Sequence, residues 1–277
     1  MSATTLTPTT TGTLAVAGAH LAYEVVGAGT AVVLLHAGVA DARMWDAQAV
    51  AFAERFTVIR YDLRGFGRSG AAVGRFSHRA DLLALLDALG VGRAYLVGLS
   101  MGGSLAVDMA LAHPDRVAAV VAAAARPSGQ EASPEMRQSW AAIDAAVEAG
   151  DLDRAVELEL RMWVDGPYRS PDAVDPAVRE LVRLMDAPLL AAPDDGDPEP
   201  LDPPALGRLA DIATPTLVIV GDRDQPDTVA GSHLLAAGIP GAARVTIPGV
   251  AHLINLERPD AFNLAVLEFL ARIDAGS

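Results

Sequence analysis

Ser100 is the strongest candidate for a catalytic nucleophile, because the chain contains no cysteine. It lies in the G-x-S-x-G pattern Gly98–Gly102, which follows an apolar run and opens a helical pattern. A strand-to-helix turn of this kind leaves no room for side chains near the serine, so glycines flank it. The turn lifts the hydroxyl above the edge of a sheet, where it can attack a carbonyl carbon. The spacing therefore predicts nucleophilic catalysis at Ser100.

A serine hydroxyl attacks efficiently only when a base accepts its proton. Among the six histidines, His252 is the best candidate, since it lies in the loop Pro248–His252 directly after the last strand pattern. Loops at the ends of strands are where α/β folds place catalytic groups. The other histidines fall at a hairpin, at strand or helix ends, or within a helix, where structural roles are typical.

A histidine base in turn needs a carboxylate that orients its ring. Two candidates stand in Gly221-Asp222-Arg223-Asp224, directly after the apolar run Thr216–Val220. The spacing alone leaves both Asp222 and Asp224 open, because one of them could instead cap the helix that follows.

The elements that must position these groups are short apolar runs alternating with longer helical patterns. This alternation predicts an α/β fold with a mostly parallel sheet flanked by helices on both faces. The first two runs flank Gly18 and predict a hairpin, whereas later runs are almost wholly apolar, as parallel strands are. The expected strands are Leu14–Val16, Leu21–Val25, Ala31–His36, Thr57–Tyr61, Ala94–Leu99, Val117–Ala123, Thr216–Val220 and Arg244–Ile247. The expected helices between them are Ala42–Arg55, Ser77–Leu89, Met101–Ala112, Pro226–Ala237 and Pro259–Ile273.

Residues 126–209 interrupt the alternation, and no convincing strand pattern occurs there. The helical patterns in this stretch are Pro134–Ala149, Leu152–Val164 and Pro176–Met185. An acidic, Pro-rich connection, 193–204, follows them. An all-helical insertion between two strands predicts a lid over the carboxyl edge of the sheet. We therefore expect a core formed by residues 1–125 and 210–277 and a helical lid formed by residues 126–209.

Four motifs together resemble the α/β-hydrolase fold family of serine hydrolases, over nearly the full length of the chain. They are His36-Ala37-Gly38, Asp62-Leu63-Arg64-Gly65-Phe66-Gly67-Arg68-Ser69, the elbow Gly98–Gly103, and the stretch Gly249–Pro259 that contains His252. The order serine, aspartate, histidine along the chain is also that of the family.

The resemblance implies a role for several individual residues. The last aspartate of the G-x-x-D stretch is the acid of the family's triad, which favours Asp224 over Asp222. Two backbone N–H groups form the family's oxyanion hole, and the matching positions are Met101 and Gly38. The family usually has glycine where this chain has Ala37, and alanine does not readily adopt a positive φ, so the loop is expected to differ locally.

Two further motif residues are expected to be structural. The stretch Asp62–Ser69 is expected to support the oxyanion loop, with Asp62 and Arg64 forming a structural ion pair. His36 is expected to bond the backbone of the same loop.

A serine at the elbow indicates acyl transfer, since relatives that open epoxides or displace halides carry aspartate there. We expect a small-to-medium carboxylic ester or lactone as substrate, cleaved through an acyl-enzyme. The elbow resembles those of enol-lactonases and perhydrolases, so a perhydrolase or a carbon–carbon bond hydrolase stays open as an alternative. A ligand-binding, receptor-like protein with little turnover is an alternative of another class.

Two apolar residues are candidates for the substrate pocket. Trp163 ends the apolar stripe of its helical pattern, next to Gly166-Pro167, and Leu253 follows His252. An apolar pocket with few polar anchors suits a small organic substrate.

Composition excludes several classes of function. All 21 basic residues other than histidine are arginine, so the chain has no lysine for a Schiff base or a P-loop. The net charge of -14 disfavours nucleic-acid binding. No metal-ligand spacing and no dinucleotide fingerprint occurs, so neither a metal nor another cofactor is expected. Residues 1–11 are polar and no apolar run is long enough for a membrane helix, which favours a cytoplasmic protein.

Overall fold

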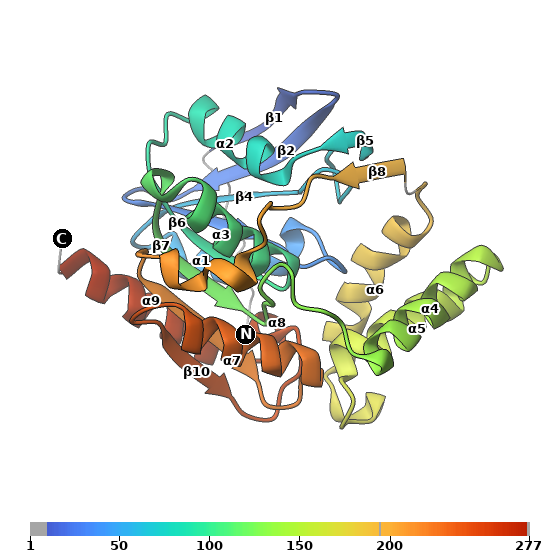
Figure 1. The fold of residues 1–277 in the computed structure, drawn as a ribbon. Coiled ribbons are helices and arrows are strands. Elements are labelled where there is room, and N and C mark those ends of the chain that lie inside the picture. Colours follow the sequence, from blue (N-terminus) through green and yellow to red (C-terminus); the bar gives the residue numbers. More distant parts are fainter. Residues whose placement is uncertain (1–9, 194, 276–277) are drawn as a thin grey trace.

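An eight-stranded sheet forms the centre of the protein in a computed structural model that describes residues 10–193 and 195–275 (Figure 1). The strand order is β1-β2-β4-β3-β6-β7-β9-β10. The strands are β1 Thr10–Val16, β2 Ala19–Val26, β3 Ala31–Leu35, β4 Thr57–Tyr61, β6 Ala94–Leu99, β7 Val117–Ala123, β9 Thr216–Gly221 and β10 Ala243–Ile247. Of the polar N-terminal residues 1–11 considered in the sequence analysis, residues 1–9 lie outside the described part of the chain.

The sheet is antiparallel at one edge and parallel elsewhere, so the predicted mostly parallel sheet is confirmed. β1 and β2 form a hairpin around Gly18, whose φ of 77° is a conformation that glycine adopts without strain. β2 also pairs antiparallel with β4. From β4 to β10 every neighbouring pair is parallel, and β3, β6 and β9 are buried along their whole length.

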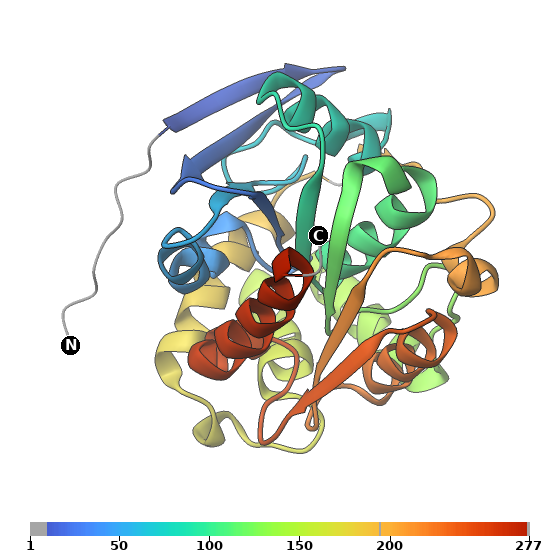
Figure 2. The same ribbon diagram turned by 90° about the vertical axis from the view of Figure 1, so that its left-hand side faces the viewer.

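Helices cover both faces of the sheet, and each face has its own apolar core (Figure 2). One core contains side chains of α1 (Asp46–Phe52) and α9 (Pro259–Ala275). The other contains side chains of α2 (His78–Ala88), α3 (Met101–Ala112) and α7 (Pro226–Gly238). In the described part of the chain, no helix is both long and apolar enough to cross a bilayer.

Residues 126–209 are named here the cap segment, and its helices α4 (Pro134–Glu148), α5 (Leu152–Glu159) and α6 (Pro176–Leu190) lie to one side of the sheet (Figure 1). The segment also contains a π-helical turn (Leu160–Asp165). Its apolar side chains Val156, Leu160 and Val182 join the same core as α1 and α9. The cap segment therefore packs on the rest of the protein through continuous apolar contacts.

The expectation of an all-helical segment is wrong in one place. β8 (Asp195–Pro198) lies within the cap segment and pairs in parallel with β5 (Val73–Phe76), a second strand that the sequence did not indicate. β8 consists only of aspartate, glycine and proline, which have low β propensity, and β5 is four residues long with Gly74 inside it, so neither shows a strand pattern. Pairing between the two segments, which are far apart in the chain, is what makes each of them extended.

Candidate active site

Ser100 lies in a sharp turn between β6 and α3, in the left-handed region at φ 56° and ψ −117°. Its N–H donates to the Ala123 carbonyl at 2.8 Å, which fixes the turn to β7. A Cβ at Gly98 would lie 2.1 Å from the Gly102 carbonyl oxygen, and one at Gly102 would lie 2.1 Å from that of Leu35. The elbow therefore needs glycine at both positions, and it holds Ser100 in a conformation typical of strained functional sites.

His252 and Asp224 form a buried pair in loops that follow β10 and β9. The Nδ1 atom of His252 lies 2.9 Å from Asp224 Oδ2 and 3.0 Å from Oδ1, so Nδ1–H donates to the carboxylate. The two side chains are 3% and 1% exposed, and this burial excludes water from the contact. The imidazole is thus oriented with Nε2 as its free nitrogen. Among the described residues, neither Nε2 nor the Ser100 hydroxyl takes part in a hydrogen bond with another protein group.

Asp222, the alternative acid, has a different partner. Its Oδ1 accepts from the Gly249 N–H at 2.6 Å, three residues before His252. Asp222 therefore holds the histidine loop, while Asp224 contacts the ring itself.

Gly38, which carries one candidate oxyanion donor, lies beside the side chain of Met101, which carries the other. A Cβ at Gly38 would be 4.0 Å from Met101 Sδ. Met101 is the first residue of α3, where the N–H has no partner within the helix. The Gly102 N–H donates to the His36 carbonyl at 3.1 Å, which ties the elbow to the loop that carries Gly38.

His36 supports this loop from beneath, as predicted. Its Nδ1–H donates to the Ala37 carbonyl at 2.8 Å and its Nε2 accepts from the Leu63 N–H at 2.9 Å. Burial lowers the pKa of His36, which keeps the ring neutral and suited to both bonds. Ala37 does not have a positive φ, so replacing the family's glycine causes no backbone strain there.

Asp62 and Arg64 do not form the expected ion pair. Asp62 instead accepts from the backbone N–H groups of Ala42 at 2.8 Å and Arg68 at 2.9 Å. Arg64 pairs with Asp81 of α2 at 2.7 Å. Asp81 lies outside the motif 62–69, so the spacing of residues within the motif cannot reveal that it is the partner of Arg64.

Trp163 and Leu253, the two predicted pocket residues, have different surroundings. The Trp163 ring lies 4.5 Å from the His252 ring, centroid to centroid, at a tilt of 40°, and its side chain is partly exposed. Leu253 has no exposed surface, because it packs into the core with Val250 and Ile254. Leu253 is therefore not available to a substrate, and that part of the pocket prediction is wrong.

The cap segment is bonded to the loop that carries His252. Arg169 pairs with Glu257 and also donates to the Gly249 carbonyl at 3.1 Å. Glu257 accepts from the Ala251 N–H at 3.1 Å, next to His252. Sequence reasoning missed Arg169 and Glu257, since only their contacts across the fold show this role.

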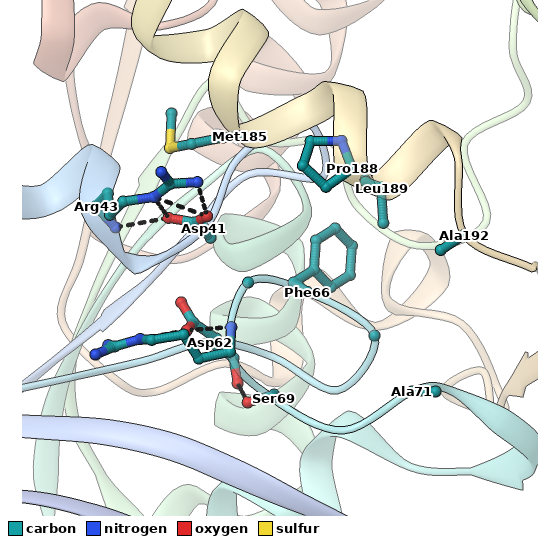
Figure 3. A pocket seen from close by; sticks show the side chains of 13 residues that line it. Asp41, Arg43, Asp62, Phe66, Ser69, Ala71, Met185, Pro188, Leu189 and Ala192 are labelled. Carbon is teal, nitrogen blue, oxygen red and sulfur yellow. Dashed lines mark hydrogen bonds and ion pairs between the residues drawn. The ribbon is translucent and has the colours of Figure 1, made fainter. Parts of the chain in front are cut away.

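A cavity of about 500 Å³ opens between α6 and the loops after β3 and β4 (Figure 3). Its wall combines apolar side chains with two arginine–carboxylate pairs, Arg43–Asp41 and Arg68–Asp62. The lining residues include Phe66, Ala71, Met185, Pro188, Leu189 and Ala192. The Phe66 ring lies 4.9 Å from that of His36, so the cavity is adjacent to the oxyanion loop. Ser100 and His252 are not part of its wall.

Two carboxyl groups of the cap segment have strongly raised pKa values. Burial raises the pKa of Glu159 to about 7. The charge of Asp144 adds to this rise, whereas Trp163 and the charge of His252 act against it. Burial and the charge of Glu159 raise the pKa of Asp186 to about 8. No group of three or more potential metal ligands occurs in residues 10–193 and 195–275.

The chain matches the model of the alpha/beta hydrolase fold over residues 30–259. An enol-lactonase structure from Burkholderia xenovorans LB400 is 32% identical, with a TM-score of 0.76 and coverage of 94% of this chain and 100% of that one. A hydrolase structure from Pseudomonas aeruginosa PA01 is 34% identical, also with a TM-score of 0.76, and covers 95% and 98%.

A relative from Azorhizobium caulinodans, named as a RutD carbamate hydrolase, is 32% identical over 276 residues, 92% of this chain and 97% of the relative. These similarities extend over the sheet, the elbow and the cap segment alike. The chain belongs to the alpha/beta hydrolase fold family.

Proposed function

We propose that this enzyme is a serine hydrolase that cleaves a small-to-medium carboxylic ester or lactone through an acyl-enzyme on Ser100. The observation that carries the proposal is the buried contact between His252 Nδ1 and Asp224, in loops at the edge of the sheet where the strained elbow presents Ser100. A histidine held in this tautomer has Nε2 available as a base.

In the proposed reaction, Nε2 of His252 accepts the Ser100 proton as the serine oxygen attacks the carbonyl carbon. The Asp224 carboxylate stabilises the imidazolium that forms. The N–H groups of Met101 and Gly38 donate to the oxyanion of the tetrahedral intermediate. His252 then protonates the departing alkoxide, which leaves the acyl group on Ser100. Water, deprotonated by His252, releases the acid and restores the serine.

The relatives support an ester or lactone as the scissile group. The matched structures include an enol-lactonase and, at 28% identity, an esterase from Thermogutta terrifontis. One relative is named as a carbamate hydrolase, and a carbamate, like an ester, has a carbonyl carbon that a serine can attack. A carbamate is therefore the second candidate substrate. We further propose that the cap segment acts as a lid and selects the substrate, with Trp163 facing it.

The test is hydrolysis of p-nitrophenyl butyrate by the wild type and by two serine variants. Ser100→Ala should lower kcat by about 10⁴ or more and abolish labelling by a fluorophosphonate. Ser139→Ala, at an exposed position of α4, is the matched control and should leave both unchanged. Labelling that persists in Ser100→Ala would refute the assignment. Absence of ester turnover by a folded wild type would favour the receptor-like alternative.

A further inference from the structure

Glu159 and Asp186 are carboxyl groups inside the cap segment that lack a counter-ion. Asp186 is 1% exposed, and neither its Oδ2 nor Glu159 Oε2 has a hydrogen-bond partner. In the described part of the chain, no arginine forms an ion pair with either group, and the sequence has no lysine. A buried carboxylate without such partners is unfavourable by several kcal/mol, so it is rare in folded proteins unless it serves a purpose.

Other buried carboxylates of the protein are treated differently. Asp81 pairs with Arg64 at 2.7 Å, and Asp165, which also lies in the cap segment, pairs with Arg179. These buried acids thus each pair with an arginine, and one of them, Asp165, is only six residues after Glu159 in the chain. Asp108 is also buried without an ion pair, but it accepts a hydrogen bond from Ser128, whereas Asp186 Oδ2 and Glu159 Oε2 have no donor.

The position of this pair relates it to the catalytic centre. Glu159 is the last residue of α5, four residues before Trp163, whose side chain lies near enough to the carboxyl group to act on its pKa. The Trp163 ring in turn packs against His252 at 4.5 Å. Asp186 lies on α6 beside Met185, which lines the cavity of Figure 3. Glu159 therefore lies near the base, and Asp186 lies near Glu159 on the helix that forms one wall of the cavity.

We propose that Glu159 and Asp186 form a binding site for a protonated amine or guanidinium group of the substrate, so that the preferred ester or lactone is cationic. Nitrogen-bound protons would satisfy the carboxylate oxygens that have no partner, and the positive charge would neutralise the pair. The Trp163 ring adds an aromatic face that attracts a cation. The net charge of -14 further favours the approach of cations to the protein.

This assignment rests on the proposed hydrolase function, because it concerns the substrate of that site. A neutral donor would satisfy the same oxygens but leave the charge uncompensated. The alternative without any ligand is a pair of acids that share a proton. The two possibilities differ in whether amines bind, and the experiment separates them.

The experiment compares hexylammonium with 1-hexanol as inhibitors of p-nitrophenyl butyrate hydrolysis at pH 8. The two probes have the same chain, and only one of them is cationic. Wild-type enzyme should bind hexylammonium at least about tenfold more tightly, as expected of a charge-assisted contact in a buried site. Equal inhibition constants would overturn the proposal. The same probes are also compared by the shift in Tm of the wild type, a readout independent of turnover.

Variants show whether the two acids are responsible. Glu159→Gln and Asp186→Asn keep the shape of each side chain and should each reduce the preference for hexylammonium about tenfold. Asp153→Asn removes the same charge from an exposed position of α5 and should leave the preference unchanged. A preference that survives in the Glu159→Gln/Asp186→Asn double variant would overturn the assignment.

The preference should also rise with pH. The charged groups that act on Glu159 are Asp144 of α4 and His252, and the charge of Glu159 acts on Asp186. The pKa values of about 7 and about 8 mean that both acids ionise between pH 6 and pH 9. Hexylammonium stays cationic over this range, and comparison with 1-hexanol removes effects of His252 on turnover. A ratio of inhibition constants that does not change with pH would contradict the proposal. If the wild type lacks esterase activity, the hydrolase proposal fails, while the Tm shifts still test the amine site.

Discussion

Replacing Glu159 by glutamine should stabilise the protein in alkaline solution and have little effect in acid. Burial raises the pKa of Glu159 from 4.5 in its ordinary state to about 7 in the folded protein. Between these values the unfolded chain has lost the proton that the folded protein keeps. The free energy of unfolding therefore falls as the pH rises, until the folded group has also ionised. Glutamine cannot ionise, so the variant escapes this loss.

The magnitude follows from the difference between the two pKa values. A shift from 4.5 to about 7 corresponds to a loss of about 3 kcal/mol above pH 8, of which about 1 kcal/mol is already present at pH 5. The variant should thus gain about 2 kcal/mol relative to the wild type between pH 5 and pH 8.5. For a chain of 277 residues, this amounts to about 4 °C in Tm.

Thermal unfolding of wild type and Glu159→Gln, followed by circular dichroism at several pH values, measures this gain. Asp153→Asn is the control, because it removes a carboxylate from the same helix at an exposed position. Its difference in Tm from the wild type should not depend on pH in this range. The reasoning is refuted if the two variants show the same small change, since Glu159 would then ionise as readily in the folded protein as in the unfolded chain.

Three further substitutions test the site. Asp224→Asn should lower kcat by about 10⁴, and far more than Asp222→Asn, because only Asp224 contacts His252; equal losses in ester assays would contradict this. Trp163→Ala should change the ratio of kcat/KM between short and bulky esters about tenfold, whereas a lower Tm with an unchanged ratio would indicate packing alone. Arg169→Met leaves the buried Glu257 unpaired and should lower the free energy of unfolding by about 3 kcal/mol in urea titrations, and adding Glu257→Gln should restore part of it.

The elements that carry the strongest sequence patterns could be predicted well. The strands Thr57–Tyr61, Ala94–Leu99 and Val117–Ala123 occur at the predicted residues. The last two are almost wholly apolar because they are buried nearly throughout. The elbow could be predicted too, since its glycines are required by backbone contacts of about 2 Å that any side chain would make.

Features that depend on contacts between distant segments could not be predicted. The helical pattern Leu152–Val164 continues as a π-helical turn from Leu160, where the carbonyl of Met162 accepts from Gln225 of the acid loop. Leu253 is apolar beside a polar site, and sequence cannot tell a pocket wall from a core position. Glu159 resembles any helical surface glutamate, because its burial arises only when α6 packs against α5.

The bonds from Arg169 to the loop that carries His252 limit how the cap segment could be replaced by that of another family member. Gly166 reinforces them, since a Cβ at that position would lie 2.5 Å from the Arg223 carbonyl oxygen and 2.8 Å from Ala251. The candidate base is thus held partly by the cap segment, which we propose selects the substrate. A cap transplanted from a relative would bring new specificity but misplace the imidazole unless Glu257 and the loops around Arg223 and Ala251 came with it. A change in the cap segment that alters the substrate range should therefore also alter the reaction rate.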